Sequence, residues 1–317
     1  MAADFSHLPV LQDEVISFIK QTPMRTVVDC TLGGGGHTLS ILEAASAERV
    51  IGIDQDSEAL AAAQARLKQF DNIEFVKSNF GDLRQVLADY QAPIDAFLFD
   101  LGVSSWQLDS AQRGFSYQHS APLDMRMDQD SALTAREIVN NWSQQELTRI
   151  FREFGEERWA SRIAQFIVER RNNREIVTTA DLVEIIKAAI PAAARRKGGH
   201  PGRRVFQALR IAVNGELDSL AAGLEAAIDL LAPGGRIIVI SYHSLEDRIV
   251  KRLFREQAEP CRCPKEIPVC VCGTLPVVRV VNRKPVVPES QEIELNPRAR
   301  SAKLRVAEKL SSKENRG

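Results

Sequence analysis

The stretch Thr26-Val-Val-Asp29-Cys-Thr-Leu-Gly33-Gly34-Gly35-Gly36-His37-Thr38 decides the fold class. A short apolar run, a block of glycines and a helical pattern from about Thr38 to Ala47 predict a strand, a tight turn and a helix. Glycines at this point let the backbone turn sharply and let a ligand approach the main chain. Gly33 and Gly35 fit the dinucleotide-binding pattern G-x-G-x-x-G, but Thr38 occupies its third glycine position. A nicotinamide oxidoreductase is therefore a distant alternative, and a glycine-rich turn without a ligand is another.

Further apolar runs repeat this arrangement on either side of a long interruption. Strands are predicted at 26–29, 49–53, 73–76, 94–99 and 236–241, the last after the turn Pro233-Gly-Gly235. Strands that alternate with helices of 10–15 residues are typical of a parallel, doubly wound α/β sheet. The interval between the fourth and fifth strands is much longer than a crossover requires, so it must contain an insert.

The insert has the sequence pattern of helices. Ser143-Gln-Gln-Glu146 is a capping box, and the helix that it opens should end near Gly155. Further helices are expected over 156–171, from Thr178 or Thr179 to before Pro191, and over 205–231. The sequence therefore predicts a Rossmann-like sheet domain in two parts, 1–104 and 213–317, that carries an inserted all-α domain, 105–212.

Three side chains should accompany the glycine loop at the carboxyl edge of the sheet. Asp54 ends the second strand, where a carboxylate can accept hydrogen bonds from both hydroxyls of a ribose. Asp100 ends the fourth strand, beside the crevice where such sheets bind ligands. Phe80 follows the third strand and offers an aromatic face for an adenine ring, although a role in the core is the alternative. The combination of Asp29, Gly33 and Gly35 is typical of methyltransferases that use S-adenosylmethionine.

The charge is distributed unevenly along the chain. Residues 1–148 contain 21 Asp and Glu against 10 Lys and Arg, whereas residues 149–317 contain 21 against 31. The interval from Arg195 to Arg210 includes six basic residues and no acidic one. Such a pattern indicates contact with a polyanion such as RNA, with a solvated helix face as the alternative.

Composition and hydropathy favour an ordinary globular enzyme. Hydrophobic residues make up 44% of the 317 residues and charged residues 26%. The sequence has no run of about 18 uninterrupted apolar residues, which a membrane span needs. Residues 1–11 lack a basic segment followed by an apolar block, so no secretory signal is predicted. These features predict a cytoplasmic protein without a membrane partner.

Several long motifs make the sequence resemble the bacterial 16S ribosomal RNA cytosine-N4 methyltransferase family, known as small-subunit rRNA methyltransferase H. The resemblance covers nearly the whole chain. The motifs are His7-Leu-Pro-Val-Leu11, the loop from Gly33 to His37, Asp100-Leu-Gly-Val-Ser-Ser105, Pro122-Leu-Asp-Met-Arg-Met-Asp128, Phe154-Gly-Glu-Glu-Arg158, Phe206-Gln-Ala-Leu-Arg-Ile211, Ser241-Tyr-His-Ser-Leu-Glu-Asp-Arg-Ile249 and Asn296-Pro-Arg-Ala-Arg-Ser301.

The resemblance implies a cofactor, a substrate and a set of binding residues. The cofactor would be S-adenosylmethionine, and the substrate the exocyclic amine of one cytidine in the decoding centre of 16S rRNA. The partner would be the small ribosomal subunit or a late precursor of it, and the sequence leaves a homodimer open. By the same resemblance, the residues that contact the cofactor are Gly35, Gly36, His37, Asp54, Phe80, Asp100 and Gln107, next to the loop residue Gly33.

The group that accepts the amine proton is not determined by the motifs. Amino methyltransferases often have Asp or Asn followed by Pro-Pro after the fourth strand, and this chain has Asp100-Leu-Gly-Val instead. The candidates are Asp100 with nearby carbonyl groups, Asp124, Asn214 and His243. For His243 a turn histidine hydrogen-bonded to Glu246 is an equal alternative. The candidate contacts to RNA phosphates are Arg126, Arg195, Arg196, Lys197, Arg203 and Arg204.

Four late cysteines form two Cys-x-Cys pairs, which are Cys261 with Cys263 and Cys270 with Cys272. They predict either a structural zinc ion bound tetrahedrally or reduced thiols without a metal. Two other classes of function stay open, namely a methyltransferase of DNA amines and an RNA-binding assembly factor without catalytic activity. Cofactor binding and the identity of the methylated nucleic acid would separate them.

Overall fold

The protein divides into two compact parts. The computed structural model describes residues 9–45, 47–195, 199–261, 263 and 271–311. One part, the sheet unit, consists of Met1–Gly102 and Leu217–Gly317, and the other, the helical unit, is Val103–Glu216. The interval 105–212 expected for the insert is slightly shorter at both ends than the helical unit.

The described residues of the sheet unit form one seven-stranded sheet. Its strands are β1 (Thr26–Asp29), β2 (Arg49–Asp54), β3 (Ile73–Lys77), β4 (Ile94–Asp100), β5 (Leu231–Ser241), β6 (Val278–Val280) and β7 (Lys303–Lys309). Their order across the sheet is β3-β2-β1-β4-β5-β7-β6. The first five strands pair in parallel, whereas β7 pairs antiparallel with both β5 and β6. The parallel strands end at a common carboxyl edge, which carries the glycine loop.

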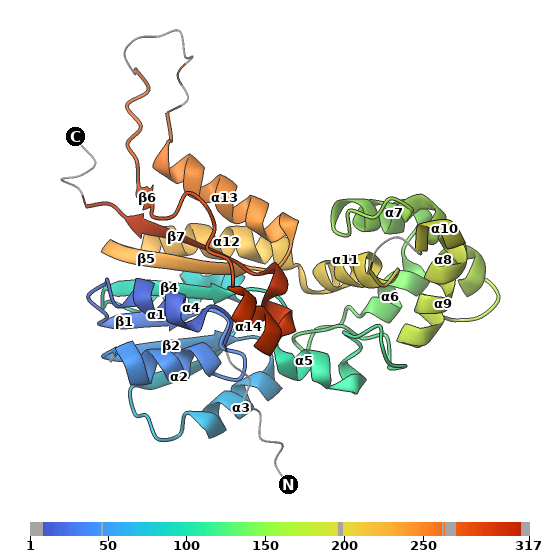
Figure 1. Cartoon of the computed structure of the whole chain (residues 1–317), viewed down its shortest axis with the longest axis horizontal. Helices are drawn as coiled ribbons and strands as arrows, with labels where there is room; N and C mark the ends of the chain where they lie inside the picture. The colour runs from blue at the N-terminus through green and yellow to red at the C-terminus, as the bar shows by residue number, and fades with distance from the viewer. Residues whose placement is uncertain (1–8, 46, 196–198, 262, 264–270, 312–317) are drawn as a thin grey trace. The chain divides into compact units, whose positions relative to one another are not determined.

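Helices cover both faces of this sheet (Figure 1). Alternate residues of each central strand enter different hydrophobic clusters: Val27 and Leu98 belong to one, and Val28 and Phe97 to the other. Burial on both faces explains why the strands are continuous apolar runs in the sequence. The helices of this unit are α1 (Gln12–Ile19), α2 (Gly36–Ser40) with a π-helical turn at Ile41–Ala45, α3 (Ser57–Arg66), α4 (Leu83–Val86), α12 (Glu216–Leu230), α13 (Ser244–Ala258) and α14 (Ser290–Leu295).

The helical unit has a hydrophobic core of its own. Side chains such as Ile138, Phe151, Ile163 and Leu209 are fully buried in it. Its helices are α5 (Ser105–Asp109), α6 (Ala135–Asn141), α7 (Gln144–Glu153), α8 (Ala160–Arg171), α9 (Thr179–Ala189), α10 (Ala192–Arg195) and α11 (Arg203–Asn214). A sheet of five parallel strands extended by the antiparallel β7 and covered by helices on both faces, together with an all-helical insert, confirms the fold class expected from the sequence.

Two helix starts follow from side-chain caps that the sequence displays. The hydroxyl of Ser143 accepts the N–H of Glu146, whose carboxylate in turn accepts the N–H of Ser143, so the predicted capping box is confirmed. Thr178 and Asp181 form the same arrangement at the start of α9. Each box satisfies backbone donors that the first turn of a helix leaves without partners.

Three boundaries differ from the sequence prediction. The expected helix over 205–231 is two helices, because Gly215 adopts a φ of 60° and ends α11. The strand expected at 236 begins at Leu231, because Ile94 of β4 pairs with Leu231 and Ala96 with Arg236. The register shift between these two pairs leaves room for the Pro-Gly-Gly turn within the strand. The helix expected from residue 156 begins at Ala160, because Glu156 has a φ of 48°.

The charge asymmetry of the sequence does not separate the two units. The helical unit contains 17 Lys and Arg against 14 Asp and Glu, and the sheet unit 24 against 28. The change of sign near residue 148 falls inside the helical unit, and the basic half of the chain is shared between both units. The net charges are thus +3 for the helical unit and −4 for the sheet unit, a much smaller difference than between the two halves of the sequence, so the local basic stretch must carry any argument for RNA binding. Among the described residues, no helix has the length and apolar character of a membrane span.

Candidate functional site

The glycine loop is shaped by one residue that must be glycine and one that faces open space. Gly35 has a φ of 74°, and a Cβ atom there would lie 2.9 Å from Cδ1 of Leu67. A side chain at this position is therefore disfavoured by backbone strain and by packing. A Cβ atom on the exposed Gly34 would meet nothing within 4 Å. Packing within the described residues does not require a glycine at position 34, which agrees with a ligand that approaches the main chain there.

Asp29 and Thr38 hold this loop from the inside. The Thr38 hydroxyl donates to Asp29 Oδ2 at 2.7 Å, and the N–H of Thr31 donates to Oδ1 at 3.2 Å. The carboxyl is buried, and burial raises its pKa in spite of these hydrogen bonds. Thr38, which breaks the dinucleotide pattern in the sequence, thus closes the loop around a buried acid.

Asp54 lies beside the glycine loop at the end of β2. The N–H of Gly33 donates to its Oδ2 at 2.8 Å, and the N–H of Asp56 donates to its Oδ1 at 2.9 Å. Burial raises the pKa of Asp54 to about 6, and these two hydrogen bonds oppose the rise. Each carboxylate oxygen has a second lone pair, so the group retains the capacity to accept hydroxyl donors from a ligand.

Asp100, at the end of β4, is surrounded by polar groups of the sheet unit. Its N–H donates to the Thr31 hydroxyl at 2.6 Å, and its Oδ1 accepts the Tyr242 hydroxyl at 2.7 Å. Its Oδ2 lies 3.5 Å from Nε2 of His37. His37 is 7% exposed, and neither ring nitrogen forms a hydrogen bond within the part of the chain that the structure describes. A buried polar group without a partner is uncommon in proteins, so His37 marks a position where a bound molecule would supply the missing contacts.

Phe80 is half-buried at the start of the short 3-10 turn that follows β3. Its ring packs edge-on against Phe99, with ring centroids 5.7 Å apart and an angle of 83° between the planes. Asn79 fixes the turn, because its Oδ1 accepts the N–H of Gly81 at 2.7 Å. Phe80 therefore packs against the core and also keeps a partly exposed ring, so both alternatives from the sequence, a core residue and an aromatic face for adenine, stay open.

The remaining predicted cofactor residue, Gln107, belongs to the helical unit. Gln107 is buried. Its side-chain oxygen accepts the backbone N–H of Ser104 at 3.1 Å, and its backbone N–H donates to the Ser104 hydroxyl. These hydrogen bonds form the capping box of α5. The described structure therefore gives Gln107 a structural role, and its contact with the cofactor stays a prediction.

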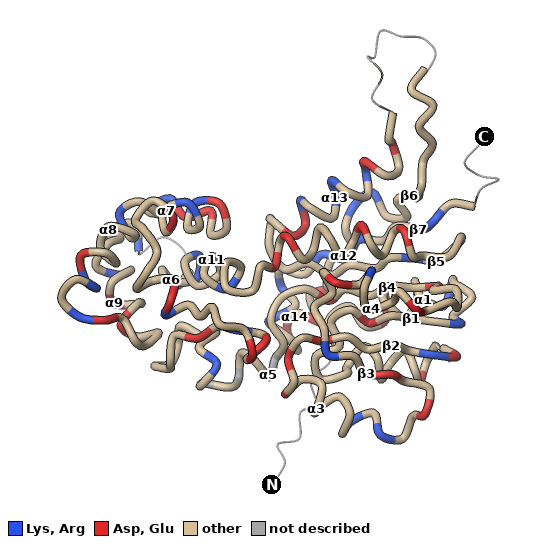
Figure 2. Tube along the Cα trace, turned by 180° about the vertical axis from the view of Figure 1, so that it is seen from behind, with Lys and Arg blue, Asp and Glu red and all other residues tan. Residues whose placement is uncertain are grey.

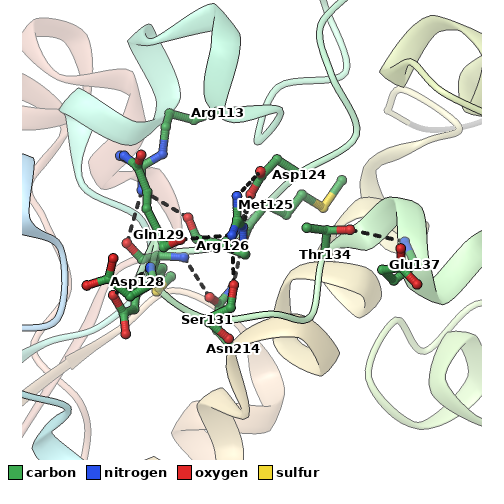
Figure 3. A network of polar contacts seen from close by, with 12 residues as sticks. Arg113, Asp124, Met125, Arg126, Asp128, Gln129, Ser131, Thr134, Glu137 and Asn214 are labelled. Atoms are coloured by element: carbon green, nitrogen blue, oxygen red, sulfur yellow. Dashed lines mark hydrogen bonds and ion pairs between the residues drawn. The ribbon is translucent and has the colours of Figure 1, made fainter.

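Asp124 and Arg126 form the centre of a polar network in the helical unit (Figure 3). Arg126 donates to both oxygens of Asp124, at 2.9 Å and 2.8 Å, and to the carbonyl groups of Gln129 and Ser131. Burial alone would raise the pKa of Asp124, but these hydrogen bonds hold it below its ordinary value. A carboxylate with a lowered pKa is a weaker base, and a guanidinium with four internal hydrogen bonds has little capacity left for a phosphate.

Asn214 fixes the same segment from the end of α11. Its side-chain oxygen accepts the N–H of Met127 at 2.7 Å, and its amide nitrogen donates to the carbonyls of Met125 and Arg210, both at 2.8 Å. Met125 has a φ of 64°, so this network holds a backbone conformation that a methionine rarely adopts. Asn214 therefore acts within the described structure as a support of the loop from 124 to 128.

His243 is the N-cap residue of α13. Its Nδ1 accepts the N–H of Glu246 at 3.4 Å, and its Nε2 lies 3.1 Å from Glu246 Oε1. The same carboxylate accepts the N–H groups of Tyr242 and His243. These contacts are those of the turn histidine considered in the sequence analysis, and they leave a substrate contact as a prediction.

The basic stretch is only partly paired. Arg195 and Arg203 are exposed, and Arg204, also exposed, donates to the carbonyl of Glu156 at 3.0 Å. Arg210 instead forms a bidentate ion pair with Glu216, at 2.8 Å and 2.7 Å. Two further members of the stretch, Arg196 and Lys197, lie outside the described residues. Figure 2 shows Lys and Arg along α11, whose N-terminus adds a partial positive charge favourable to anions.

Cys261, Cys263 and Cys272 come together in the sheet unit, and their sulfur atoms all lie within 4.8 Å of one another. Cys270, the fourth cysteine of the predicted group, lies outside the described residues. Cys30 is buried, and burial raises the pKa of its thiol well above the ordinary value, as expected for a packing residue.

The sequence analysis did not identify Tyr242 and Thr31 as part of the site. Both contact Asp100 through their hydroxyl groups, and burial, followed by the neighbouring charge of Asp100, raises the pKa of Tyr242 well above its usual range. One signal was present, because Tyr242 directly follows the fifth predicted strand and parallel strands end at one edge. Thr31 had no signal beyond its place in the loop.

Comparison with known proteins gives matches over nearly the full length. The sequence profile of the MraW methylase family matches residues 4–310. A protein named ribosomal RNA small subunit methyltransferase H from Symbiobacterium thermophilum is 55% identical over 314 residues, 98% of this chain and 98% of that protein. A protein of the same name from Heliobacterium modesticaldum is 54% identical over 310 residues, 96% of this chain and 99% of its own. Among solved structures, that of an rRNA methylase from Streptococcus thermophilus covers 96% of this chain and 100% of its own, with 12% identity and a TM-score of 0.43. The sequence similarity thus extends through both units.

Proposed function

The chain belongs to the MraW methylase family, and on this premise we propose that it transfers a methyl group from S-adenosylmethionine to ribosomal RNA of the small subunit. Relatives named for this activity align with 98% of the chain, which supports the proposal. We further infer that the acceptor is the exocyclic N4 amine of one cytidine in the decoding centre of 16S rRNA. The motifs that resemble the cytosine-N4 methyltransferases support this finer assignment.

The residues of the sheet-unit edge fit S-adenosylmethionine in polarity and in the space that they leave. Asp54 would accept the ribose hydroxyls, because its carboxylate keeps unused lone pairs beside the loop. The open face of Gly34 would allow close approach to the main chain. His37, buried without a hydrogen-bond partner in the described residues, would gain one from the ligand. This last observation carries the assignment of the site, since the described residues offer His37 Nδ1 no partner and its Nε2 only the 3.5 Å contact with Asp100 Oδ2.

When bound, S-adenosylmethionine supplies an electrophilic methyl group on a sulfonium sulfur. The chain's share of the chemistry is to align the amine with that group and to accept the proton that the amine loses. Asp100 is the best supported acceptor of the four candidates. Its Oδ2 accepts no hydrogen bond from the described residues, and the Tyr242 hydroxyl fixes the orientation of the carboxylate through Oδ1.

The other three candidates have contacts that oppose this role. Asp124 is held ionised at a lowered pKa by Arg126, so it is a weaker base than an ordinary carboxylate. Asn214 uses its amide oxygen and both amide hydrogens within the helical unit. His243 accepts a backbone hydrogen bond through Nδ1 at the start of α13, and its Nε2 lies 3.1 Å from the carboxylate of Glu246. We therefore propose that they support the loops around the reaction and do not take the proton.

On the RNA side, we propose that the exposed arginines of the basic stretch contact phosphates. Arg195, Arg203 and Arg204 are exposed, and the N-terminus of α11 lies within this stretch. Phosphate contacts position a nucleic acid without reading its sequence. The target cytosine must in addition leave its stack, as for other enzymes that modify bases.

The proposal is tested by methyl transfer to natural substrates. Small ribosomal subunits from cells that lack this enzyme would be incubated with the protein and radiolabelled S-adenosylmethionine, and the modified nucleotide identified by mass spectrometry. We expect one methyl group per subunit, on N4 of a single cytidine. At saturating cofactor, Asp100→Asn should lose most of the transfer rate, with calorimetry separating this loss from any loss of cofactor affinity, whereas Asp124→Asn in folded protein should retain more of the rate.

Other outcomes would contradict parts of the proposal. Labelling of duplex DNA in preference to ribosomal particles would indicate a DNA amine methyltransferase. Absence of cofactor binding by calorimetry, with retained binding to subunits, would indicate an assembly factor without catalytic activity. A methyl group on a different base or atom would contradict the N4 assignment and leave the transfer activity intact.

A further inference from the structure

The segment between α13 and β6, here called the excursion, is described by the structure at residues 259–261, 263 and 271–277. Its described parts extend beyond the ends of α13 and β6 in Figure 1. The base is closed, because the N–H of Val277 donates to the carbonyl of Gln257 at 2.9 Å and the side chain of Val278 is buried. The outgoing arm carries Cys261 and Cys263, and the returning arm carries Cys272. The two arms are therefore held together at their base by the fold, and further out they bring cysteines face to face.

The distances between these cysteines fit a shared metal ion. All three sulfur atoms lie within 4.8 Å of one another, and those of Cys261 and Cys272 are 3.8 Å apart. A tetrahedral zinc site with zinc–sulfur distances of about 2.3 Å has sulfur–sulfur edges of about 3.8 Å. A disulfide between Cys261 and Cys272 would require about 2.05 Å. The geometry of this pair thus corresponds to two ligands of one ion and not to a covalent bond between them.

Packing does not account for the cluster. Cysteine is normally one of the most buried residues, and Cys30 of this chain, at 2% exposure, follows that rule. Cys261 and Cys272 are exposed, and Cys263 is half-buried. The neighbouring apolar side chains Val271 and Leu275 are 76% and 52% exposed. Among the described residues, the excursion thus lacks a hydrophobic core that would hold its arms together.

We propose that Cys261, Cys263 and Cys272 bind a structural zinc ion that ties the two arms of the excursion together. Clustered thiolates select zinc, copper(I) or iron–sulfur centres, and a closed four-coordinate site on two loops is typical of structural zinc. Binding converts each thiol to a thiolate and releases one proton per cysteine, so the three sulfurs become anionic ligands of the divalent ion. The ion lies apart from the glycine loop in the chain and plays no part in methyl transfer.

The test begins with the metal content of untagged, full-length protein purified without chelators. Elemental analysis is expected to give about one zinc per chain. Replacement of zinc by cobalt(II) should produce a thiolate-to-metal charge-transfer band and the intense visible bands of a tetrahedral site. Cys261→Ser and Cys272→Ser should each reduce the zinc content at least about tenfold, because a site that loses a thiolate binds far more weakly. Cys30→Ala, which removes a buried thiol elsewhere, should leave the content unchanged.

If the serine variants fold poorly, a second measurement on the parent protein tests the same ligands. Titration with a thiol-specific reagent, followed by a zinc-sensitive dye, should release zinc in step with the modification of the surface thiols. Cys270→Ser tests separately whether that residue is the fourth ligand, and a loss of zinc would complete the set. Metal-free protein whose surface thiols all react at once, a disulfide detected by mass spectrometry, or zinc that survives the Cys261 and Cys272 variants would overturn the proposal. None of these results bears on cofactor binding, so the proposed function is tested independently.

Discussion

The carboxyl edge of the sheet unit and the loop from 124 to 131 in the helical unit both contain charged residues in irregular backbone, yet they use them differently. At the sheet edge, His37 has no hydrogen-bond partner among the described residues, and one oxygen of Asp100 accepts none. In the loop, Arg126 makes four internal hydrogen bonds with its guanidinium, and Asn214 makes three. The first region thus leaves polar groups that a ligand could contact, whereas the polar groups of the second contact one another.

This contrast limits what a motif can reveal. Pro122-Leu-Asp-Met-Arg-Met-Asp128 stands out in the sequence as clearly as the glycine loop, and both contain charges suited to catalysis. A residue that holds a loop in a strained conformation tolerates few substitutions, and so does a residue that touches a substrate. Met125, with its φ of 64°, lies in such a strained loop. Only the contacts in the structure distinguish a residue that binds a ligand from one that supports the loop around it.

The sharpest test of the contrast is Asp54→Ala in the sheet unit. Loss of a carboxylate that accepts ribose hydroxyls should weaken S-adenosylmethionine binding by about 2–4 kcal/mol, roughly 30- to 1,000-fold. Calorimetric titration would measure the dissociation constant, with circular dichroism as the control for folding. Unchanged affinity in folded protein would remove Asp54 from the cofactor site and weaken the distinction between the regions.

The matching change in the helical unit is Asn214→Ala, which should affect stability and not the cofactor. Three hydrogen bonds around Met125 and Met127 would be lost, at a cost of about 1–3 kcal/mol in the free energy of unfolding. Asn141→Ala is the control, because the Asn141 amide donates only to the exposed carboxylate of Glu137. Denaturant unfolding would measure both. A stable Asn214→Ala protein that binds the cofactor but cannot transfer the methyl group would identify the loop as catalytic.

Acid should affect the sheet-unit edge through Asp54, whose pKa burial raises to about 6. Acceptance of hydroxyl donors requires the ionised carboxylate, so affinity for the cofactor should fall as the pH drops through this value. Between pH 7 and pH 5 the ionised fraction decreases roughly tenfold, and the affinity should decrease by about the same factor. Calorimetry at several pH values would show this, and Asp54→Asn should bind more weakly with no such dependence. The same dependence in the asparagine variant would assign the titration to another group.

The smallest effects are expected for the exposed arginines of the basic stretch. Arg203→Ala and Arg204→Ala should each flatten the salt dependence of RNA binding by about 0.7–0.9 on a double-logarithmic plot, if each contacts one phosphate. Arg149→Ala on α7 removes an equal charge from an exposed pair with Glu153 and should leave the slope unchanged. Binding measured over a range of salt concentrations provides the comparison. If the slopes of all three variants equal that of the parent protein, the basic stretch is a solvated surface and does not contact RNA phosphates.

Much of the fold follows from the sequence, because strong local signals coincide with tertiary packing. The parallel strands β1, β2, β4 and β5 contain continuous apolar runs since both faces of the sheet are covered there, and the capping boxes at Ser143 and Thr178 fix helix starts locally. The strands β6 and β7 were missed. β7 reads Lys-Leu-Arg-Val-Ala-Glu-Lys, which is neither a continuous apolar run nor a regular alternation, and it contains Arg305, whose burial depends on its ion pair with Asp247 of α13. Such a long-range partner leaves no periodic signal in the sequence.

The candidate site was predictable to the same extent. Backbone geometry demands glycine at position 35, and parallel strands bring Asp54 and Asp100 to one edge, so these residues could be found from pattern and topology. The role of Thr38 depends on a hydrogen bond to the buried Asp29, which the spacing of the motif does not contain. Resemblance to a family names residues such as Gln107 but does not separate a cofactor contact from a helix cap.

The position of β7 has a consequence for the synthesis of the protein. This strand lies between β5 and β6 in the sheet, and Leu304, Val306 and Ala307 are fully buried, yet it begins at Lys303, long after its neighbour β5 has ended at Ser241. While translation continues, β5 has a hydrophobic edge without its neighbour, and such an edge is prone to pair with other chains. The helical unit is one continuous segment and can fold earlier, as domains generally do during synthesis. A nascent chain of this enzyme therefore has to keep an incomplete sheet out of aggregates until β7 emerges.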